Sequence, residues 1–239
     1  MSGEAGAGAV YPAAPLFRSP IRIGGAETRV LDPAMIADIR RAVTDFGGAV
    51  FHDVIEPELF KSLAGSARKA AFRQVDLEEY GLRGNDLSVE AALPFCMTLA
   101  RPAFMEWLEE ISGCDPIAHI EGHLVEMQAG NNLGWHRDAG LGIRRLALVI
   151  NLTDCIYEGG DFELRRRSTR APMFGYHAAT PGSLAVFRLA QDLEHQVTLV
   201  RSGGPRTTFS GWARGPLCAG DEMRGRPLGT WPPLAPAGA

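Results

Sequence analysis

The sequence predicts a mainly β domain that carries helices at its N-terminal end. Apolar residues recur at helical spacing in several segments before residue 113, whereas from Ile117 onward short apolar runs alternate with turn signals. The chain has 239 residues, of which 46% are hydrophobic. That length and apolar content suit one domain with a substantial core.

Three helices and one short strand are expected in the N-terminal half. Asp32 and Pro33 have the residue types of a helix N-cap and a first helical position, and Gly47-Gly48 ends this helix. Its apolar residues fall at helical spacing: Met35, Ile36, Ile39, Val43 and Phe46. A second helix is expected from Pro57 to about residue 72 and a third over about 100–112, with a buried strand at 49–51.

Residues 73–95 carry many charges together with Gly81, Gly84 and Asn85. This composition favours a loop or a partly ordered lid. No internal repeat is present.

From Ile117 the chain reads as strands separated by turns that are rich in Gly and Pro. Regular short strands of this kind are typical of a β-sandwich or barrel. The expected strands cover 117–128, 133–138, 145–153, 161–166, 183–189, 195–201 and 206–213. We expect a flexible leader (1–20), one domain (21–214, with helices over about 32–113 and the β core over about 117–214) and a Pro/Gly-rich tail (215–239).

Composition excludes several classes of function. The net charge is −4 and no long basic run is present, which argues against nucleic acid or an anionic membrane surface as a partner. No apolar run is long enough to cross a bilayer. The four cysteines are scattered without a CxxC pair, so we expect a reduced, cytoplasmic protein. The sequence does not indicate an oligomeric state.

The residues that carry chemistry are His136 and Asp138, read together with His195. Two residues that are two apart on a strand project from the same face, so His136 and Asp138 can reach one metal. Two imidazoles and one carboxylate form the ligand set of an iron site that keeps open positions. His119 and His123 are four apart, which suits a shared metal only on a helix, and their segment reads as a strand.

These motifs make the chain resemble the iron(II)- and 2-oxoglutarate-dependent oxygenases, particularly the prolyl-4-hydroxylase-like branch. The matching stretches follow one another in the family's order over about 117–214: Gly134–Asp138, Leu146–Leu152, Glu158–Leu164, Pro181–Phe187, His195–Val197 and Arg206–Trp212. One departure is that relatives often place a tyrosine in the strand before the HxD motif, where this chain has Met127 or Gln128.

The resemblance implies a double-stranded β-helix, or jelly roll, with His136, Asp138 and His195 as the iron ligands. Arg206 matches the residue that binds the far carboxylate of 2-oxoglutarate, and its planar fork suits a carboxylate. Thr208 shares a strand face with Arg206 and is expected to donate a hydrogen bond to the same group. Arg201 is the competing arginine. Asn151 is a further candidate for the co-substrate pocket, or else an interior strand residue that satisfies the backbone.

The implied cofactors are Fe(II) and 2-oxoglutarate, with O2 as co-substrate and ascorbate as a reductant. The implied enzyme is a dioxygenase that hydroxylates an unactivated C–H bond and releases succinate and CO2. Related halogenases replace the ligand carboxylate with a small residue, so the presence of Asp138 favours hydroxylation. Desaturation, epoxidation and cyclisation remain alternatives. A zinc hydrolase with the same ligands and a non-catalytic iron and 2-oxoglutarate sensor are alternatives of other classes.

A small molecule, an amino acid or a peptide is the expected substrate. In this architecture residues 73–95 and 166–180 would cover it. Arg137, Arg144 and Arg165–Arg167 could orient an acidic group or could simply be solvated.

Overall fold

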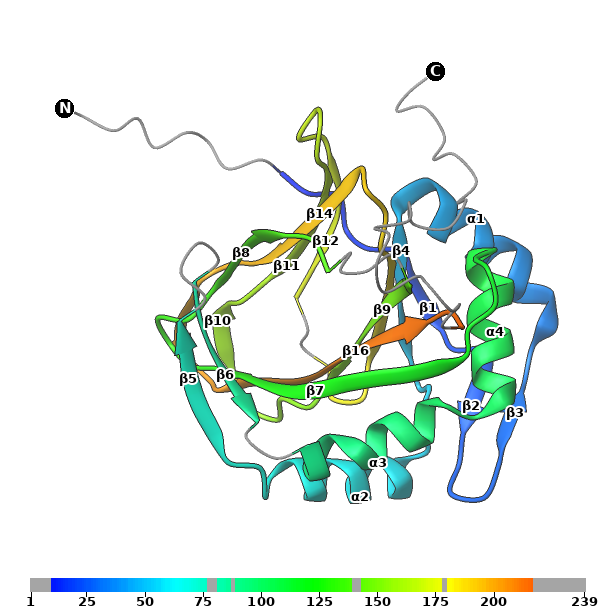
Figure 1. The fold of residues 1–239 in the computed structure, drawn as a ribbon, viewed down its shortest axis with the longest axis horizontal. Coiled ribbons are helices and arrows are strands. Elements are labelled where there is room, and N and C mark those ends of the chain that lie inside the picture. The colour runs from blue at the N-terminus through cyan, green and yellow to red at the C-terminus, as the bar shows by residue number, and fades with distance from the viewer. Residues whose placement is uncertain (1–9, 77–80, 87–88, 139–142, 178–179, 217–239) are drawn as a thin grey trace.

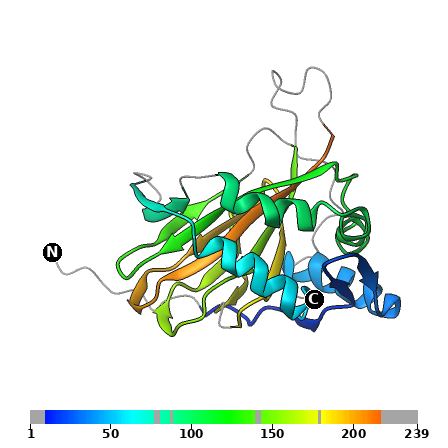
Figure 2. The ribbon, with the colours of Figure 1, turned by 90° about the horizontal axis from the view of Figure 1, so that it is seen from below.

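Two β-sheets face each other, and helices cover the outer side of the larger sheet (Figures 1 and 2). The computed structural model describes residues 10–76, 81–86, 89–138, 143–177 and 180–216. The larger sheet has eight strands in the order β1-β4-β13-β9-β16-β7-β6-β5, and the smaller has four in the order β12-β11-β14-β8. This mainly β architecture with N-terminal helices confirms the predicted fold class.

The strands of the larger sheet come from both halves of the chain: β1 (Leu16–Arg18), β4 (Gly48–His52), β5 (Phe72–Asp76), β6 (Leu82–Asp86), β7 (His119–Met127), β9 (Arg144–Asn151), β13 (Leu184–Arg188) and β16 (Arg206–Arg214). The smaller sheet contains β8 (Leu133–His136), β11 (Phe162–Arg166), β12 (Pro172–Tyr176) and β14 (Leu193–Val197). Two further pairs complete the strands: β2 (Ile21–Ile23) with β3 (Thr28–Val30), and β10 (Tyr157–Gly159) with β15 (Val200–Gly203).

The helices are η1 (Pro33–Met35), α1 (Ile36–Phe46), α2 (Pro57–Ala67), α3 (Val89–Leu99) and α4 (Pro102–Ser112). Asp32 caps the first turn as expected, because its Oδ1 accepts a hydrogen bond from the Ala34 N–H at 3.1 Å. Gly47 ends α1 in the left-handed region with φ 82°. None of the described helices is long and apolar enough to span a membrane.

Strands β9 and β16 explain how one sheet can have two buried faces. In β9, Leu146, Leu148 and Ile150 pack in the large core beneath the helices, whereas Ala147 and Val149 face the smaller sheet. Strand β16 alternates in the same way. Phe209 points to the helices and stacks on Phe95 of α3 with ring centroids 5.0 Å apart. The even-numbered side chains of β16 therefore point into the space between the sheets.

Several predicted boundaries are wrong. Part of the expected leader is ordered, because β1 pairs in parallel with β4 from Leu16 to Arg18, while residues 1–9 lie outside the described residues. The second helix ends at Ala67 instead of about residue 72. The predicted loop 73–95 contains most of the β5–β6 hairpin and the start of α3. Its charges misled the prediction because an edge strand such as β5, which is largely exposed, tolerates them.

The β half follows the prediction more closely. Each of the seven expected strands overlaps an observed one, and the third helix corresponds to α4. Strands β10 and β12 were not predicted, and the run expected at 195–201 belongs to β14 and β15. Residues 139–142 and most of the predicted tail (217–239) lie outside the described residues.

Candidate metal and co-substrate site

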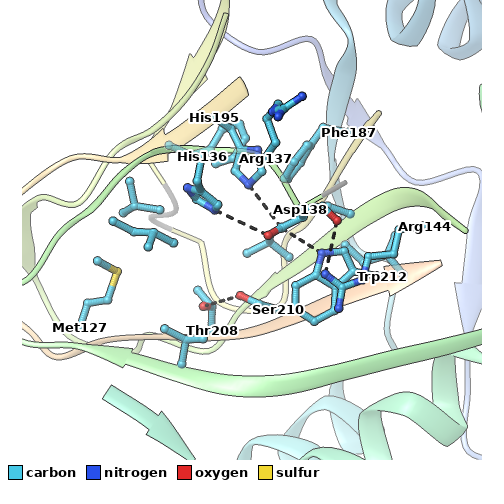
Figure 3. A pocket seen from close by; sticks show the side chains of 18 of the residues that line it. Met127, His136, Arg137, Asp138, Arg144, Phe187, His195, Thr208, Ser210 and Trp212 are labelled. Atoms are coloured by element: carbon cyan, nitrogen blue, oxygen red, sulfur yellow. Dashed lines mark hydrogen bonds and ion pairs between the residues drawn. The ribbon is translucent and has the colours of Figure 1, made fainter. Parts of the chain in front are cut away.

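The three predicted metal ligands come together in one cavity between the sheets (Figure 3). His136 ends β8, Asp138 follows it, and His195 lies in the neighbouring strand β14 directly opposite His136. One nitrogen from each histidine and one carboxylate oxygen all lie within 4.8 Å of one another. His136 Nε2 is 3.8 Å from Asp138 Oδ1, and His195 Nε2 is 3.4 Å from Asp138 Oδ2.

Hydrogen bonds orient this group. His136 Nδ1 lies 2.7 Å from the Gly134 carbonyl oxygen. This contact places the proton on Nδ1 and leaves Nε2 free to bind a metal. The Trp212 indole N–H donates to Asp138 Oδ2 at 2.9 Å. Burial alone would raise the pKa of the Asp138 carboxyl, but the hydrogen bond and charge of His195, the charge of His136 and the Trp212 bond hold that pKa well below its usual range.

A cavity of about 420 Å³ opens beside the three ligands. Its walls come from both sheets and are apolar around the ligands, with Leu133, Val149, Phe187 and Val197 among the lining residues. Asp138 is the single carboxylate that lines it within the described residues. The donor set of two imidazoles and one carboxylate fits Fe(II) with open coordination positions.

Arg206 lies in the same cavity and is only 2% exposed. Its Nη1 is 3.8 Å from the sulfur of Met127, and it donates a hydrogen bond to the Tyr157 hydroxyl. Among the described residues it makes no ion pair, and its Nε has no hydrogen-bond partner. A buried cation with unused donors calls for an anion, because an unpaired buried charge is strongly destabilising. The site therefore fits the carboxylate of 2-oxoglutarate.

Gly160 explains how the Arg206 side chain reaches this position. A Cβ at Gly160 would lie 3.0 Å from Arg206 Cδ and 3.2 Å from the Tyr157 ring, and the residue has φ +64°. Both the close approach and the backbone conformation favour glycine there. This packing supplies a physical reason for the Gly159-Gly160 pair of the sequence motif.

The remaining predicted co-substrate residues have different positions. Thr208 is buried and lines the cavity two residues from Arg206, with its Oγ1 3.5 Å from the Ser210 hydroxyl. Asn151 does not line the cavity. Its Oδ1 accepts a hydrogen bond from the Thr153 N–H at 3.0 Å, which fits the alternative role of satisfying the backbone. Arg201 is exposed on β15 and does not line the cavity, so the geometry favours Arg206.

Sequence reasoning missed Trp212, Tyr157 and Ser210. Trp212 could have been predicted as a cavity residue, because it and Arg206 are both even-numbered residues of β16 and so share one strand face. Tyr157 carries no such signal, because it belongs to an unpredicted strand. The segments 73–95 and 166–180, expected to cover the substrate, contribute no lining residue within their described parts.

Comparison with known proteins places this geometry in a family. Residues 122–214 match the model of the 2OG-Fe(II) oxygenase superfamily. The β core of this chain is therefore similar to that superfamily over the matched residues. The oxygenase match starts within β7, ends with β16 and so includes the three ligands and Arg206. The expected enzyme class, a 2-oxoglutarate-dependent dioxygenase, is confirmed with the family, which implies Fe(II), 2-oxoglutarate and O2.

Solved structures show the same fold. A 2OG-Fe(II) oxygenase family oxidoreductase from Burkholderia pseudomallei is 14% identical with a TM-score of 0.61, covering 84% of this chain and 96% of its own. A Pseudomonas putida prolyl-4-hydroxylase is 16% identical with a TM-score of 0.56 and coverages of 75% and 98%. A Trichoplax adhaerens prolyl hydroxylase, in complex with a hypoxia inducible factor peptide fragment, is 11% identical with a TM-score of 0.54 and coverages of 76% and 89%. The search of curated proteins gives no match.

Proposed function

We propose that this oxygenase hydroxylates an unactivated C–H bond of a small molecule, an amino acid or a peptide, with release of succinate and CO2. The observation that carries the proposal is the juxtaposition of His136, Asp138 and His195 with a buried Arg206 in one cavity. Arg206 makes no ion pair with any residue that the structure describes. A zinc hydrolase would need the three ligands but would have no use for a buried arginine on the cavity wall. A peptide substrate is included because the Trichoplax neighbour was solved with a peptide.

Each part of the site has a task in this reaction. His136, Asp138 and His195 would hold Fe(II), which when bound supplies the coupling of O2 activation to oxidative decarboxylation of 2-oxoglutarate. Arg206 binds the distal carboxylate, and Thr208 lies on the same strand face to donate to it. Trp212 fixes the Asp138 carboxylate. The apolar wall around the ligands excludes water and protects a reactive site.

The test is succinate formation by the purified protein with Fe(II), 2-oxoglutarate and O2, with and without ascorbate, across a panel of small molecules, amino acids and peptides. We expect iron-dependent succinate release that a substrate stimulates and that His136→Ala abolishes while the fold persists. Mass spectrometry of the product distinguishes a gain of one oxygen from desaturation or cyclisation. Hydrolysis that depends on zinc and ignores 2-oxoglutarate would contradict the proposal.

A further inference from the structure

The three metal ligands divide the cavity into two ends. Figure 3 shows Met127 and Thr208 on one side of the ligands and Arg144 and Trp212 on the other. The first end holds Arg206, which contacts Met127, and so fits the co-substrate. The second end is therefore left for the substrate. This assignment rests on the proposed function.

Arg144 is held rigidly at the second end. Its guanidinium stacks over the Trp212 ring, with Cζ 3.7 Å from the ring centroid, and its Nε donates to Glu121 Oε1 at 3.0 Å. One terminal nitrogen also reaches the Asp138 carbonyl oxygen at 3.4 Å. A guanidinium has five N–H donors, so those two bonds leave three donors that make no hydrogen bond to a described residue. A fixed fork suits a carboxylate because little side-chain freedom is lost on binding.

The charge around Arg144 is not balanced within the described residues. Glu121 also pairs with Arg214, so two guanidinium groups share one carboxylate. Arg137 also lines the cavity, and it is exposed. The single lining carboxylate, Asp138, belongs to the metal ligands. An excess of positive charge at the mouth of an apolar cavity attracts anions.

The other arginines that could orient an acidic group lie elsewhere. Arg165 stacks over Trp135 at 3.6 Å and pairs with Glu194 at 2.7 Å, and Arg166 pairs with Asp192. None of the residues Arg165–Arg167 lines the cavity. The structure thus places Arg137 and Arg144 at the cavity and Arg165–Arg167 outside it, a distinction that the sequence does not make.

We propose that the substrate carries a carboxylate and that Arg144 binds it, which makes Arg144 a determinant of specificity. Trp212 supplies the face on which the guanidinium is held, and Arg137 adds positive charge at the rim. The carboxylate belongs either to a free organic acid or to an acidic side chain within a peptide. Both sources present the same planar anion to Arg144.

The test is calorimetric binding to the full chain loaded with Mn(II) and saturated with 2-oxoglutarate under anaerobic conditions. Matched probes are butyrate against butyramide, benzoate against benzamide, and N-acetyl-aspartate methylamide against N-acetyl-asparagine methylamide. We expect acids to bind roughly tenfold or more tightly than their amides, since a charge-assisted pair exceeds a neutral hydrogen bond. Binding of butyrate and benzoate alone would identify a free organic acid as the source of the carboxylate. Binding of the aspartate probe alone would identify an acidic side chain within a peptide.

Two variants and a matched control complete the test. Arg144→Met should remove the preference for acids without changing the affinity for 2-oxoglutarate, and Arg144→Lys should retain part of it. Arg167→Met removes an exposed arginine outside the cavity and should behave like the wild type. Equal binding of acids and amides, no acid binding at millimolar concentration, or an intact preference in folded Arg144→Met would each overturn the inference. Failure of the wild-type protein to bind Mn(II) or 2-oxoglutarate would instead contradict the proposed function.

Discussion

Arg206 is the residue whose environment is hardest to explain without a ligand. It is buried, its Nε has no partner among the described residues, and it donates a hydrogen bond to the Tyr157 hydroxyl. Burial raises the pKa of Tyr157 even though the Arg206 charge opposes that shift, so the phenol stays protonated at neutral pH. A neutral phenol leaves the guanidinium charge for an incoming carboxylate.

Replacement of Arg206 by methionine should therefore weaken 2-oxoglutarate binding by roughly a hundredfold, because a bidentate, charge-assisted pair is lost. Titration of 2-oxoglutarate into Mn(II)-loaded protein measures this change. Arg201→Met is the matched control, since Arg201 is exposed and outside the cavity. If Arg201→Met greatly weakened 2-oxoglutarate binding and Arg206→Met did not, Arg201 would be the residue that binds the co-substrate.

Trp212 acts on the metal through Asp138. Its indole N–H donates to Asp138 Oδ2 at 2.9 Å, so Trp212→Phe removes the bond and keeps most of the ring. Loss of a hydrogen bond to a metal ligand lowers metal affinity by roughly 10–100-fold. Equilibrium titration with Mn(II) or Co(II) measures this effect, and circular dichroism shows whether the fold is kept. Wild-type metal affinity in a folded Trp212→Phe variant would exclude the role.

At the scale of elements, helix α3 supports the strand that carries the site. Phe95 of α3 is fully buried and stacks on Phe209 of β16, whose other face carries Arg206, Thr208 and Trp212. The helix thus packs directly behind the cavity wall. The sequence favours a loop up to residue 95, because many charges together with Gly81, Gly84 and Asn85 precede the helix.

Phe95→Ala should lower the free energy of unfolding by about 3–5 kcal/mol, because a large buried ring leaves a cavity that packing cannot fill. Leu93→Ala in the same helix is the matched control. Leu93 is 51% exposed, and its truncation should change stability by about 0.5 kcal/mol or less. Urea denaturation of both variants gives the comparison. Similar losses for the two would mean that α3 does not support β16 through Phe95.

The sequence allowed prediction of those elements whose pattern is local. Asp32, Pro33 and Gly47 delimit the first helical segment, and the continuous apolar run Leu146–Ile150 of β9 marks a central strand. Strands that are positioned by pairing with distant segments show no comparable local pattern in the sequence. Strand β12 is a short edge strand, and the β5–β6 hairpin is placed by its backbone pairing with β7. For Asn151 the sequence left two roles open, because its strand position was clear but its side-chain partner, the Thr153 N–H, was not.

At the scale of the whole molecule, the metal site joins the two sheets. His136 and Asp138 belong to the end of the smaller sheet, whereas Trp212, which holds Asp138, belongs to the larger sheet. A metal bound by His136, Asp138 and His195 is thereby connected to both layers of the β core. Binding to the folded state alone shifts the unfolding equilibrium toward the native protein.

Mn(II) together with 2-oxoglutarate should therefore raise the melting temperature. A ligand at a hundredfold excess over its Kd stabilises by about 2.7 kcal/mol. For a domain of this size each kcal/mol corresponds to roughly 2–4 °C. Differential scanning calorimetry should show an upward shift that EDTA reverses and that Asp138→Ala abolishes. An equal shift in Asp138→Ala would indicate that the metal binds elsewhere.

Strand β16 has a consequence for sequence change. Arg206, Thr208, Ser210 and Trp212 line the cavity, and Phe209 and Ala213 lie in the core on the opposite face. An insertion or deletion of one residue within this strand exchanges the two faces beyond that point. Such a change would disrupt the cavity and the core together, whereas a point substitution can alter one face of the strand and leave the other intact. Insertions and deletions in related sequences should therefore fall outside β16, for example in the turn at residues 203–205 that precedes it.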